Sequence, residues 1–274
     1  MLKTLRHNPI GLMGLIIVLL VVIIALIAPL ISPYSPTVQI GRRLLLPNNR
    51  FFFGTDEFGR DILSRIIYGT RISLYVGAIS VGLALLTGGL IGLVSGYFGG
   101  LLDNLLMRLV DIVFSIPSLI LAIAIAGLLG PNLRNAMIAI GIVYAPTYAR
   151  LVRAAVLSIK NLPYIEAATL IGGTTWHTIT RHLIPNITPP LIVQTSLLLS
   201  TAILAEASLS FLGLGTQPPD PSWGTMLGSG RKFMELSPWV AVAPGIAIVI
   251  TVLGFNFLGD GLRDALDPRL RGST

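Results

Sequence analysis

The chain has 274 residues, of which 53% are hydrophobic and only 11% are charged, and its mean hydropathy is +0.82. A soluble domain carries about 25% charged residues, so this composition excludes an ordinary soluble protein and indicates one that crosses a membrane several times. The net charge of +7 comes from scattered residues, which favours contact with anionic lipid headgroups over nucleic acid. The absence of cysteine excludes disulfides, thiolate metal sites and cysteine nucleophiles.

Six apolar stretches are long enough to cross the hydrocarbon core of a bilayer, which needs about 20 residues. They are 10–31, 72–97, 112–130, 135–157, 190–212 and 239–258. The first follows Lys3 and Arg6, is too long for a signal peptide and has no small-residue cleavage site after it, so we expect it to remain as a span. Pro117 is expected to kink the third span. The expected fold class is an all-α polytopic membrane protein with about six transmembrane helices.

Six crossings place both termini on the same side of the membrane. Basic residues barely distinguish the two sides, because ten of the 19 lysines and arginines lie on the side of the termini and nine on the other. The first helix and its short basic N-terminus usually dominate orientation, so we expect both termini to be cytoplasmic.

Local spacing predicts several helix contacts. Small residues at four-residue spacing form a groove that lets neighbouring backbones approach closely. The second span has this pattern at Gly88, Gly92, Gly96 and Gly100. Two charge pairs at helical spacing, Asp61 with Arg65 and Arg108 with Asp111, are expected to pair at the membrane edge.

The stretch 161–187 is the longest polar interval in the second half of the chain. Asn161 can cap a short helix, and Gly172 can end it in a left-handed conformation. A second short helix can begin at Thr174 or the residue after it, and Pro185 is expected to end that helix. The pattern predicts a helix–turn–helix hairpin between two spans.

The same stretch resembles the EAA loop of ABC importer permeases. The resemblance rests on Glu166-Ala167-Ala168, on Gly172 after three more residues, and on the terminal Pro185. His182 and Ile184 stand where the family has Ile and Leu, so the match is loose at that end. In the family this loop is cytoplasmic and its short helix sits in a cleft of the ATPase subunit. The resemblance therefore implies an ATPase-coupling role for Tyr164, Glu166, Ala167, Ala168, Gly172 and Pro185. Taken alone, the pattern also fits an amphipathic hairpin on the membrane surface.

Four further blocks resemble the dipeptide/oligopeptide/nickel branch of these permeases, and within it the C-type subunit. They are GTDEFGRD at 54–61, ILAEASLSFLG at 203–213, QPPDPSWG at 217–224 and GDGLRDALDP at 259–268. The resemblance covers roughly residues 50–272 and implies the type I ABC importer permease fold. We therefore expect three parts: an N-terminal helix and outer loop with an interfacial helix over 1–71, the permease core over 72–262, and a cytoplasmic tail over 263–274.

The resemblance also implies a function and partners. It implies a multi-pass permease subunit in a prokaryotic cytoplasmic membrane that forms the translocation path for peptides, with nickel or glutathione as alternative cargoes. It implies a heterodimer with a B-type permease subunit, two ABC ATPase subunits that carry ATP and Mg, and an extracytoplasmic substrate-binding protein. Outer loops of the family face that binding protein, which suggests a contact role for Gln217, Pro218, Pro219 and Trp223.

Glu206 lies inside an apolar segment, where an ionisable group is costly and is therefore a candidate functional residue. Either it packs, protonated or bonded to a neighbouring helix, or it serves the translocation path or a gate. An ion-coupled secondary transporter is a competing class, but such proteins usually show internal repeats, and none is visible here. A membrane scaffold without a path is a weaker alternative. The sequence contains no P-loop, HExxH or GxSxG motif, so we expect a non-enzyme with no metal and no cofactor of its own.

Overall fold

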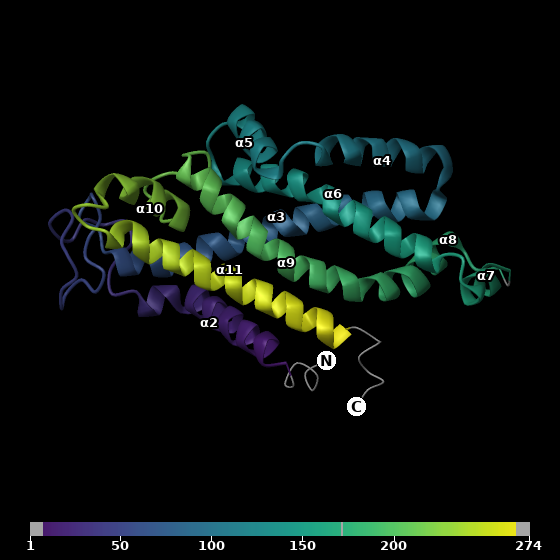
Figure 1. The fold of residues 1–274 in the computed structure, drawn as a ribbon, viewed down its shortest axis with the longest axis horizontal. Coiled ribbons are helices and arrows are strands. Elements are labelled where there is room, and N and C mark those ends of the chain that lie inside the picture. The colour runs from purple at the N-terminus through teal and green to yellow at the C-terminus, as the bar shows by residue number, and fades with distance from the viewer. Residues whose placement is uncertain (1–7, 171, 267–274) are drawn as a thin grey trace.

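The computed structural model describes residues 8–170 and 172–266, with the side chains of 166–169 left out. Its long helices run roughly along one direction in an elongated bundle (Figure 1). They are α2 Pro9–Ile31, α3 Ile62–Phe98, α4 Gly100–Phe114, α5 Ser118–Leu129, α6 Leu133–Ile159, α7 Pro163–Leu170, α8 Thr175–Thr178, α9 Ile184–Phe211, α10 Trp223–Gly230 and α11 Trp239–Leu266. A π-helical turn, Ile179–Leu183, joins α8 to α9, and a 3-10 turn, Arg231–Phe233, follows α10.

Five helical segments in the described part of the chain are long and apolar enough to cross a membrane, with Thr175–Phe211 counted as one. The bent pair α4 and α5 makes a sixth if it is counted as one span, so the expected number of about six is confirmed. The spans α3, α9 and α11 are longer than predicted, because each extends beyond its apolar stretch into polar sequence.

The two ends of the bundle differ. Residues 32–61 and α10 gather at one end, and α7 and α8 lie at the other (Figure 1). Asn8, which caps α2, donates from Nδ2 to the Oδ2 atom of Asp264 near the end of α11 at 2.7 Å. The beginning of α2 and the end of α11 therefore meet, at the end of the bundle that carries α7 and α8.

The most extensive helix interface joins α3 and α6. A Cβ atom on Gly88 would lie 2.0 Å from the carbonyl oxygen of Ala145, and one on Gly92 would lie 2.3 Å from that of Ala149. Gly96 is similarly close to α6. The predicted glycine groove is therefore confirmed along α3, and it lets the two backbones touch.

Gly100 does not belong to that groove. Gly99, at φ +67°, ends α3, and Gly100 opens α4 with no atom within 4 Å of its Cβ position. A non-glycine residue is strained at positive φ, so this pair is a hinge-like break between two helices rather than a packing surface.

The third span was predicted at 112–130 with a kink, and this prediction of one kinked helix is wrong. The chain instead forms α4 and α5, which are bent by 91°. Pro117 is the N-cap residue of α5. Proline has no amide hydrogen and disfavours a helical residue before it, so the helix stops and restarts instead of bending gently.

The prediction that Pro185 ends the second arm of the hairpin is also wrong. The amide of Ile184 donates to the carbonyl of Ile179, which closes a π-helical turn, and the helix continues through Pro185 as α9. Proline is tolerated there because it stands in the first turn after the π-helical turn. The second arm of the hairpin is therefore the beginning of the fifth span.

Candidate functional site

Residues 161–187 form the hairpin, called here the coupling hairpin. Its first arm is α7, and Gly172 reverses the chain at φ +93°, which confirms the left-handed conformation expected there. Thr174 caps α8, and its hydroxyl accepts from the amide of His177 at 3.2 Å. A Cβ atom on Gly172 would have open space around it, so only the backbone conformation requires glycine at this position.

The coupling hairpin is anchored to the bundle by one apolar cluster. Ile165 of α7 is buried in a cluster with Val152 and Val156 of α6, Leu183 of the π-helical turn and Ile187 at the beginning of α9. Burying a side chain of this size contributes about 1.5–3 kcal/mol. Ile165 therefore joins α7 to the apolar cluster that α6 and the beginning of α9 share.

An aromatic row fixes α7 to the π-helical turn. The Tyr164 ring lies edge-on to His182 at 5.8 Å, and His182 lies edge-on to His177 at 5.7 Å. Asn186 donates from Nδ2 to the hydroxyl of Tyr164 at 3.4 Å. Tyr164 thus has a positioning role inside the hairpin, although 46% of it remains exposed.

Two large apolar side chains of the coupling hairpin face outward. Leu170 is 87% exposed and Trp176 is 74% exposed. Glu166, Ala167 and Ala168 lie between Tyr164 and Leu170 in α7. Exposed apolar groups at the tip of a polar hairpin are typical of an interaction surface.

The ends of α3, α4 and α6 are joined by a charged cluster beside the coupling hairpin. Arg153 donates from Nε and Nη2 to the two carboxylate oxygens of Asp103, both at 2.6 Å, and Ser95 also donates to Asp103. Lys160 donates from Nζ to the carbonyl of Gly96 at 2.8 Å. The bidentate, charge-assisted bond ties the first turn of α4 to α6, while Ser95 and the Gly96 carbonyl connect the end of α3 to the same cluster.

The predicted pair of Arg108 with Asp111 is wrong. Asp111 instead accepts from Nη2 of Arg150 at 2.8 Å, and the Arg150 guanidinium lies 4.0 Å from the centre of the Phe114 ring. Spacing along one helix predicts local pairs only, whereas this contact and the Asp103–Arg153 contact join separate helices.

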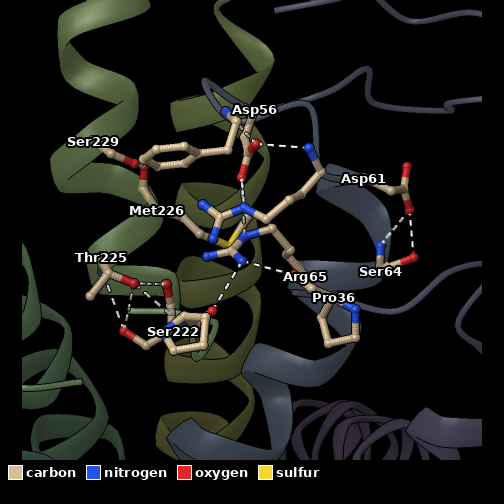
Figure 2. A network of polar contacts seen from close by, with 12 residues as sticks. Pro36, Asp56, Asp61, Ser64, Arg65, Ser222, Thr225, Met226 and Ser229 are labelled. Atoms are coloured by element: carbon tan, nitrogen blue, oxygen red, sulfur yellow. Dashed lines mark hydrogen bonds and ion pairs between the residues drawn. The ribbon is translucent and has the colours of Figure 1, made fainter. Parts of the chain in front are cut away.

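The opposite end of the bundle consists of residues 32–61 and 214–238, called here the outer cap after the side of the membrane expected for it from the sequence. Figure 2 shows its charged centre, in which Asp56 binds two buried arginines. Nε of Arg60 lies 2.7 Å from Oδ2 of Asp56, and Nε of Arg65 lies 3.5 Å from the same atom, too long for a hydrogen bond. Arg65 also donates from Nη1 to the carbonyls of Pro36 at 2.8 Å and Pro219 at 3.4 Å. One guanidinium therefore ties both segments of the outer cap to α3.

The predicted pair of Asp61 with Arg65 is wrong. Asp61 caps α3, and its Oδ2 atom accepts from the amide of Ser64 at 2.8 Å and from its hydroxyl at 2.6 Å (Figure 2). An aspartate just before a helix is well placed to accept hydrogen bonds from the free amides of the first turn, and here it does so instead of pairing with the arginine four residues later.

Trp223 is buried inside the outer cap and does not lie on its surface. It is 2% exposed, its Nε1 donates to the carbonyl of Ile66 at 3.0 Å, and its ring packs on Gly69. Such burial does not fit the contact with a binding protein that the resemblance suggested for Trp223. The other three residues assigned to that contact, Gln217, Pro218 and Pro219, are exposed.

Glu206 is fully buried near the outer end of α9. Its Oε1 atom accepts from the hydroxyls of Ser210 at 2.6 Å and Thr216 at 3.4 Å, and the amide of Thr216 donates to Ser210 at 3.0 Å. Its Oε2 atom has no hydrogen-bond partner within the described residues. The carboxyl group thus ties the last turn of α9 to the loop that follows. The serine that donates to it, Ser210, belongs to the same helix and not to a neighbouring helix.

Within the described residues, no cluster of three or more His, Asp or Glu side chains could hold a metal ion.

Comparison with known families gives two matches. Residues 88–272 match the family described as "Binding-protein-dependent transport system inner membrane component". Residues 1–47 match "N-terminal TM domain of oligopeptide transport permease C".

Curated relatives extend over nearly the whole chain. It is 47% identical to the dipeptide transport system permease protein DppC of Alkalihalophilus pseudofirmus, over 98% of this chain and 89% of that protein. It is 48% identical to the di/tripeptide transport system permease protein DppC of Pseudomonas aeruginosa, over 99% and 92%. The glutathione transport system permease protein GsiD of Pectobacterium atrosepticum is 45% identical, over 82% and 75%.

The fold is also known from a solved structure. An inward-facing conformation of the MetNI methionine ABC transporter contains a chain that superimposes with a TM-score of 0.61 at 22% identity, over 75% of this chain and 98% of that chain. At this identity the likeness establishes the shared fold, and with it the type I importer permease architecture expected from the sequence.

Proposed function

Because this chain belongs to the family of inner membrane components of binding-protein-dependent transport systems, we propose that it is the C-type permease subunit of an ABC importer and forms part of a translocation path for di- and tripeptides. The main support for peptides as the cargo is the 47–48% identity, over nearly the whole chain, to permeases named for dipeptides and di/tripeptides. The relative named for glutathione supports the same chemical class, because glutathione is itself a small peptide.

Energy for transport comes from partner subunits in this proposal. The chain has no P-loop, so it is a non-catalytic subunit, and ATP and Mg bind to two ABC ATPase subunits. The coupling hairpin is the surface that meets an ATPase, with Glu166, Ala167, Ala168 and Gly172 in the short arm that enters the ATPase cleft. The exposed Leu170 and Trp176 support this assignment, because they are apolar groups that a partner surface can cover.

A B-type permease subunit completes the path, and an extracytoplasmic substrate-binding protein meets the outer cap. Gln217, Pro218 and Pro219 are the contact candidates, since all three are exposed. The same reading divides the chain into an N-terminal helix with its outer loop over 1–71, the permease core over 72–262 and a cytoplasmic tail over 263–274.

The proposed orientation puts the coupling hairpin and both termini in the cytoplasm. The Asn8–Asp264 hydrogen bond supports it by bringing the beginning of α2 and the end of α11 together at the hairpin end. Because the chain lacks cysteine, single cysteines can be introduced and labelled with an impermeant reagent. We expect labelling from outside at 42 and 231 and from inside at 175. Labelling of position 175 from outside would overturn the orientation and the coupling role together.

The coupling step follows from the continuous helix Thr175–Phe211. Its 37 residues give about 55 Å of helix from the coupling hairpin to Glu206 and the outer cap. Closure of the ATPases would push α7, and Ile165 would pass that movement to α6 and α9. A bundle with two stable arrangements then opens outward or inward, according to which state ATP and loaded binding protein favour.

Transport in reconstituted vesicles tests this proposal. The chain is combined with its cognate B-type permease, ATPases and binding protein, and uptake of a labelled dipeptide is measured with ATP inside or outside the vesicles. We expect ATP-dependent uptake that unlabelled di- and tripeptides inhibit and nickel does not. Competition by glutathione alone would narrow the cargo to that peptide. Uptake driven by an ion gradient without ATP would favour a secondary transporter and contradict the proposal.

A further inference from the structure

A groove of about 510 Å³ lies between α2 and α3. Its walls are apolar over most of their length, with Val22, Ala25 and Leu26 on α2 and Ile72 and Leu74 on α3. Two polar side chains, Arg71 and Tyr75, complete the lining. They stand four residues apart on α3 and therefore share one face of the helix.

Both polar side chains lack protein partners. Within the described residues, neither the Arg71 guanidinium nor the Tyr75 hydroxyl makes a hydrogen bond or an ion pair. Tyr75 is 54% exposed, and Arg71 is exposed as well. Arg60 and Arg65 at this end are buried against Asp56, whereas Arg42, Arg43 and Arg231 are exposed like Arg71 but lie outside the groove. An unpaired cation and an unpaired hydroxyl thus face one apolar groove.

The position of the groove matches the edge of a bilayer. Leu26 lies about one and a half turns before Ile31, where α2 ends, and Arg71 lines the same groove. An arginine stem reaches several ångströms along a helix and can bring its charge to the headgroup layer while its methylene groups stay in hydrocarbon. An amphipathic tyrosine is typical of the same level.

We propose that this groove is a binding site for an anionic phospholipid. One acyl chain lies against Val22, Ala25 and Leu26, and the guanidinium of Arg71 binds the headgroup phosphate, to which the Tyr75 hydroxyl also donates. Charge complementarity favours this occupant over a helix of another protein, because the groove joins one cation to a long apolar wall, as a lipid joins one anion to an apolar tail. In the orientation proposed above, the lipid belongs to the outer leaflet. The inference does not depend on transport activity.

Lipid binding to the purified full-length chain tests the proposal by native mass spectrometry. The probes are phosphatidylglycerol, phosphatidylcholine with the same acyl chains, and glycerol phosphate, which has no acyl chain. We expect the chain to prefer phosphatidylglycerol, and Arg71→Gln to weaken that binding about fivefold, the contribution of one arginine near an anionic lipid surface. The matched control is Arg231→Gln, which removes an exposed positive charge from the same end of the bundle but lies outside the groove.

Two further measurements separate the lipid from other occupants. Val22→Phe fills the groove without changing the charge and should weaken binding of both phospholipids. If Arg71→Gln leaves the preference for phosphatidylglycerol unchanged, or if glycerol phosphate competes as well as the whole lipid, the proposal is wrong. In the assembled transporter, Cys introduced at Leu26 should react with a lipid-soluble maleimide. Crosslinking of that cysteine to a partner permease would instead show that protein covers the groove, and would overturn the lipid assignment.

Discussion

The outer cap and the coupling hairpin, at the two ends of one bundle, differ in which kind of side chain they bury and which kind they expose. In the outer cap, charged groups are buried and bonded within the chain, as Asp56 is to Arg60 and Arg65. In the coupling hairpin, large apolar groups such as Leu170 and Trp176 are exposed. The cap therefore holds together by itself, whereas the hairpin presents a surface whose burial needs another molecule. This difference predicts that substitutions in the cap change the stability of the chain, and that substitutions in the hairpin change its association with partners.

The largest effect is expected at Asp56. Replacing Asp56 with alanine leaves Arg60 and Arg65 buried without their carboxylate, and breaking a buried ion pair on one side costs about 3–5 kcal/mol. Asp56 also accepts from the amides of Phe58 and Arg60, so the loop loses those bonds too. We expect a clear fall in the melting temperature of the purified chain and poor expression. Glu235→Ala is the control, because it removes an exposed carboxylate from the same cap. Equal melting temperatures for the two variants would show that the buried charges do not hold the cap together.

Much of the fold could be predicted from the sequence because it depends on local patterns. Apolar length identifies the spans, four-residue glycine spacing identifies the packing groove on α3, and the left-handed conformation of Gly172 follows from its place after a short helix. Each of these features is set by residues close together in the chain, so it can be predicted from a short stretch of sequence.

The partners of charged residues could not be predicted in the same way. Spacing paired Asp61 with Arg65 and Arg108 with Asp111, whereas the structure pairs Arg65 with Asp56 and Asp111 with Arg150. Tertiary packing decides which charges are buried together, and a charge on a helix surface has several neighbours within reach. The π-helical turn before Pro185 was missed for a related reason, since a one-residue register shift leaves no distinct sequence signal.

The second prediction tests the hairpin directly. Gly172→Val places a β-branched residue at φ +93°, which costs about 1–2 kcal/mol in backbone strain unless α7 is re-aimed. Its Cβ position is in open space, so no clash in the bundle adds to that cost. We expect normal expression and melting temperature, with reduced co-purification of the ATPases or hydrolysis no longer stimulated by loaded binding protein.

The chain offers a matched control at its other end. Gly213 also has a positive φ, +80°, and open space around its Cβ position, but it follows α9 at the outer end. Gly213→Val therefore introduces similar strain far from the coupling hairpin, and ATPase co-purification should be normal. If both variants lose the ATPases equally, strain anywhere in the chain is sufficient and the hairpin has no special role.

The smallest effect is expected from Glu206→Gln. Glu206 is a buried carboxyl group that accepts from Ser210 and Thr216 through Oε1, and the amide oxygen of glutamine can accept the same two bonds. The amide nitrogen would replace Oε2, which has no partner within the described residues, so no existing hydrogen bond is lost there. We expect peptide uptake close to that of the unchanged chain and a stability change below about 1 kcal/mol, the net worth of one neutral hydrogen bond.

Glu206→Leu sharpens the interpretation, because leucine has a similar size but accepts no hydrogen bond. The hydroxyls of Ser210 and Thr216 would then be buried without their acceptor, at a cost of about 1–3 kcal/mol each unless they find new partners. A stable Gln variant beside a destabilised Leu variant is the result expected if Glu206 only ties α9 to the loop that begins the second segment of the cap. Loss of uptake by the Gln variant, at normal stability and normal ATPase association, would mean that ionisation of the carboxyl group takes part in transport. In that case the outer end of α9 would contain a gate as well as a structural bond, and the simple contrast between a self-contained cap and a partner-dependent hairpin would fail at this residue.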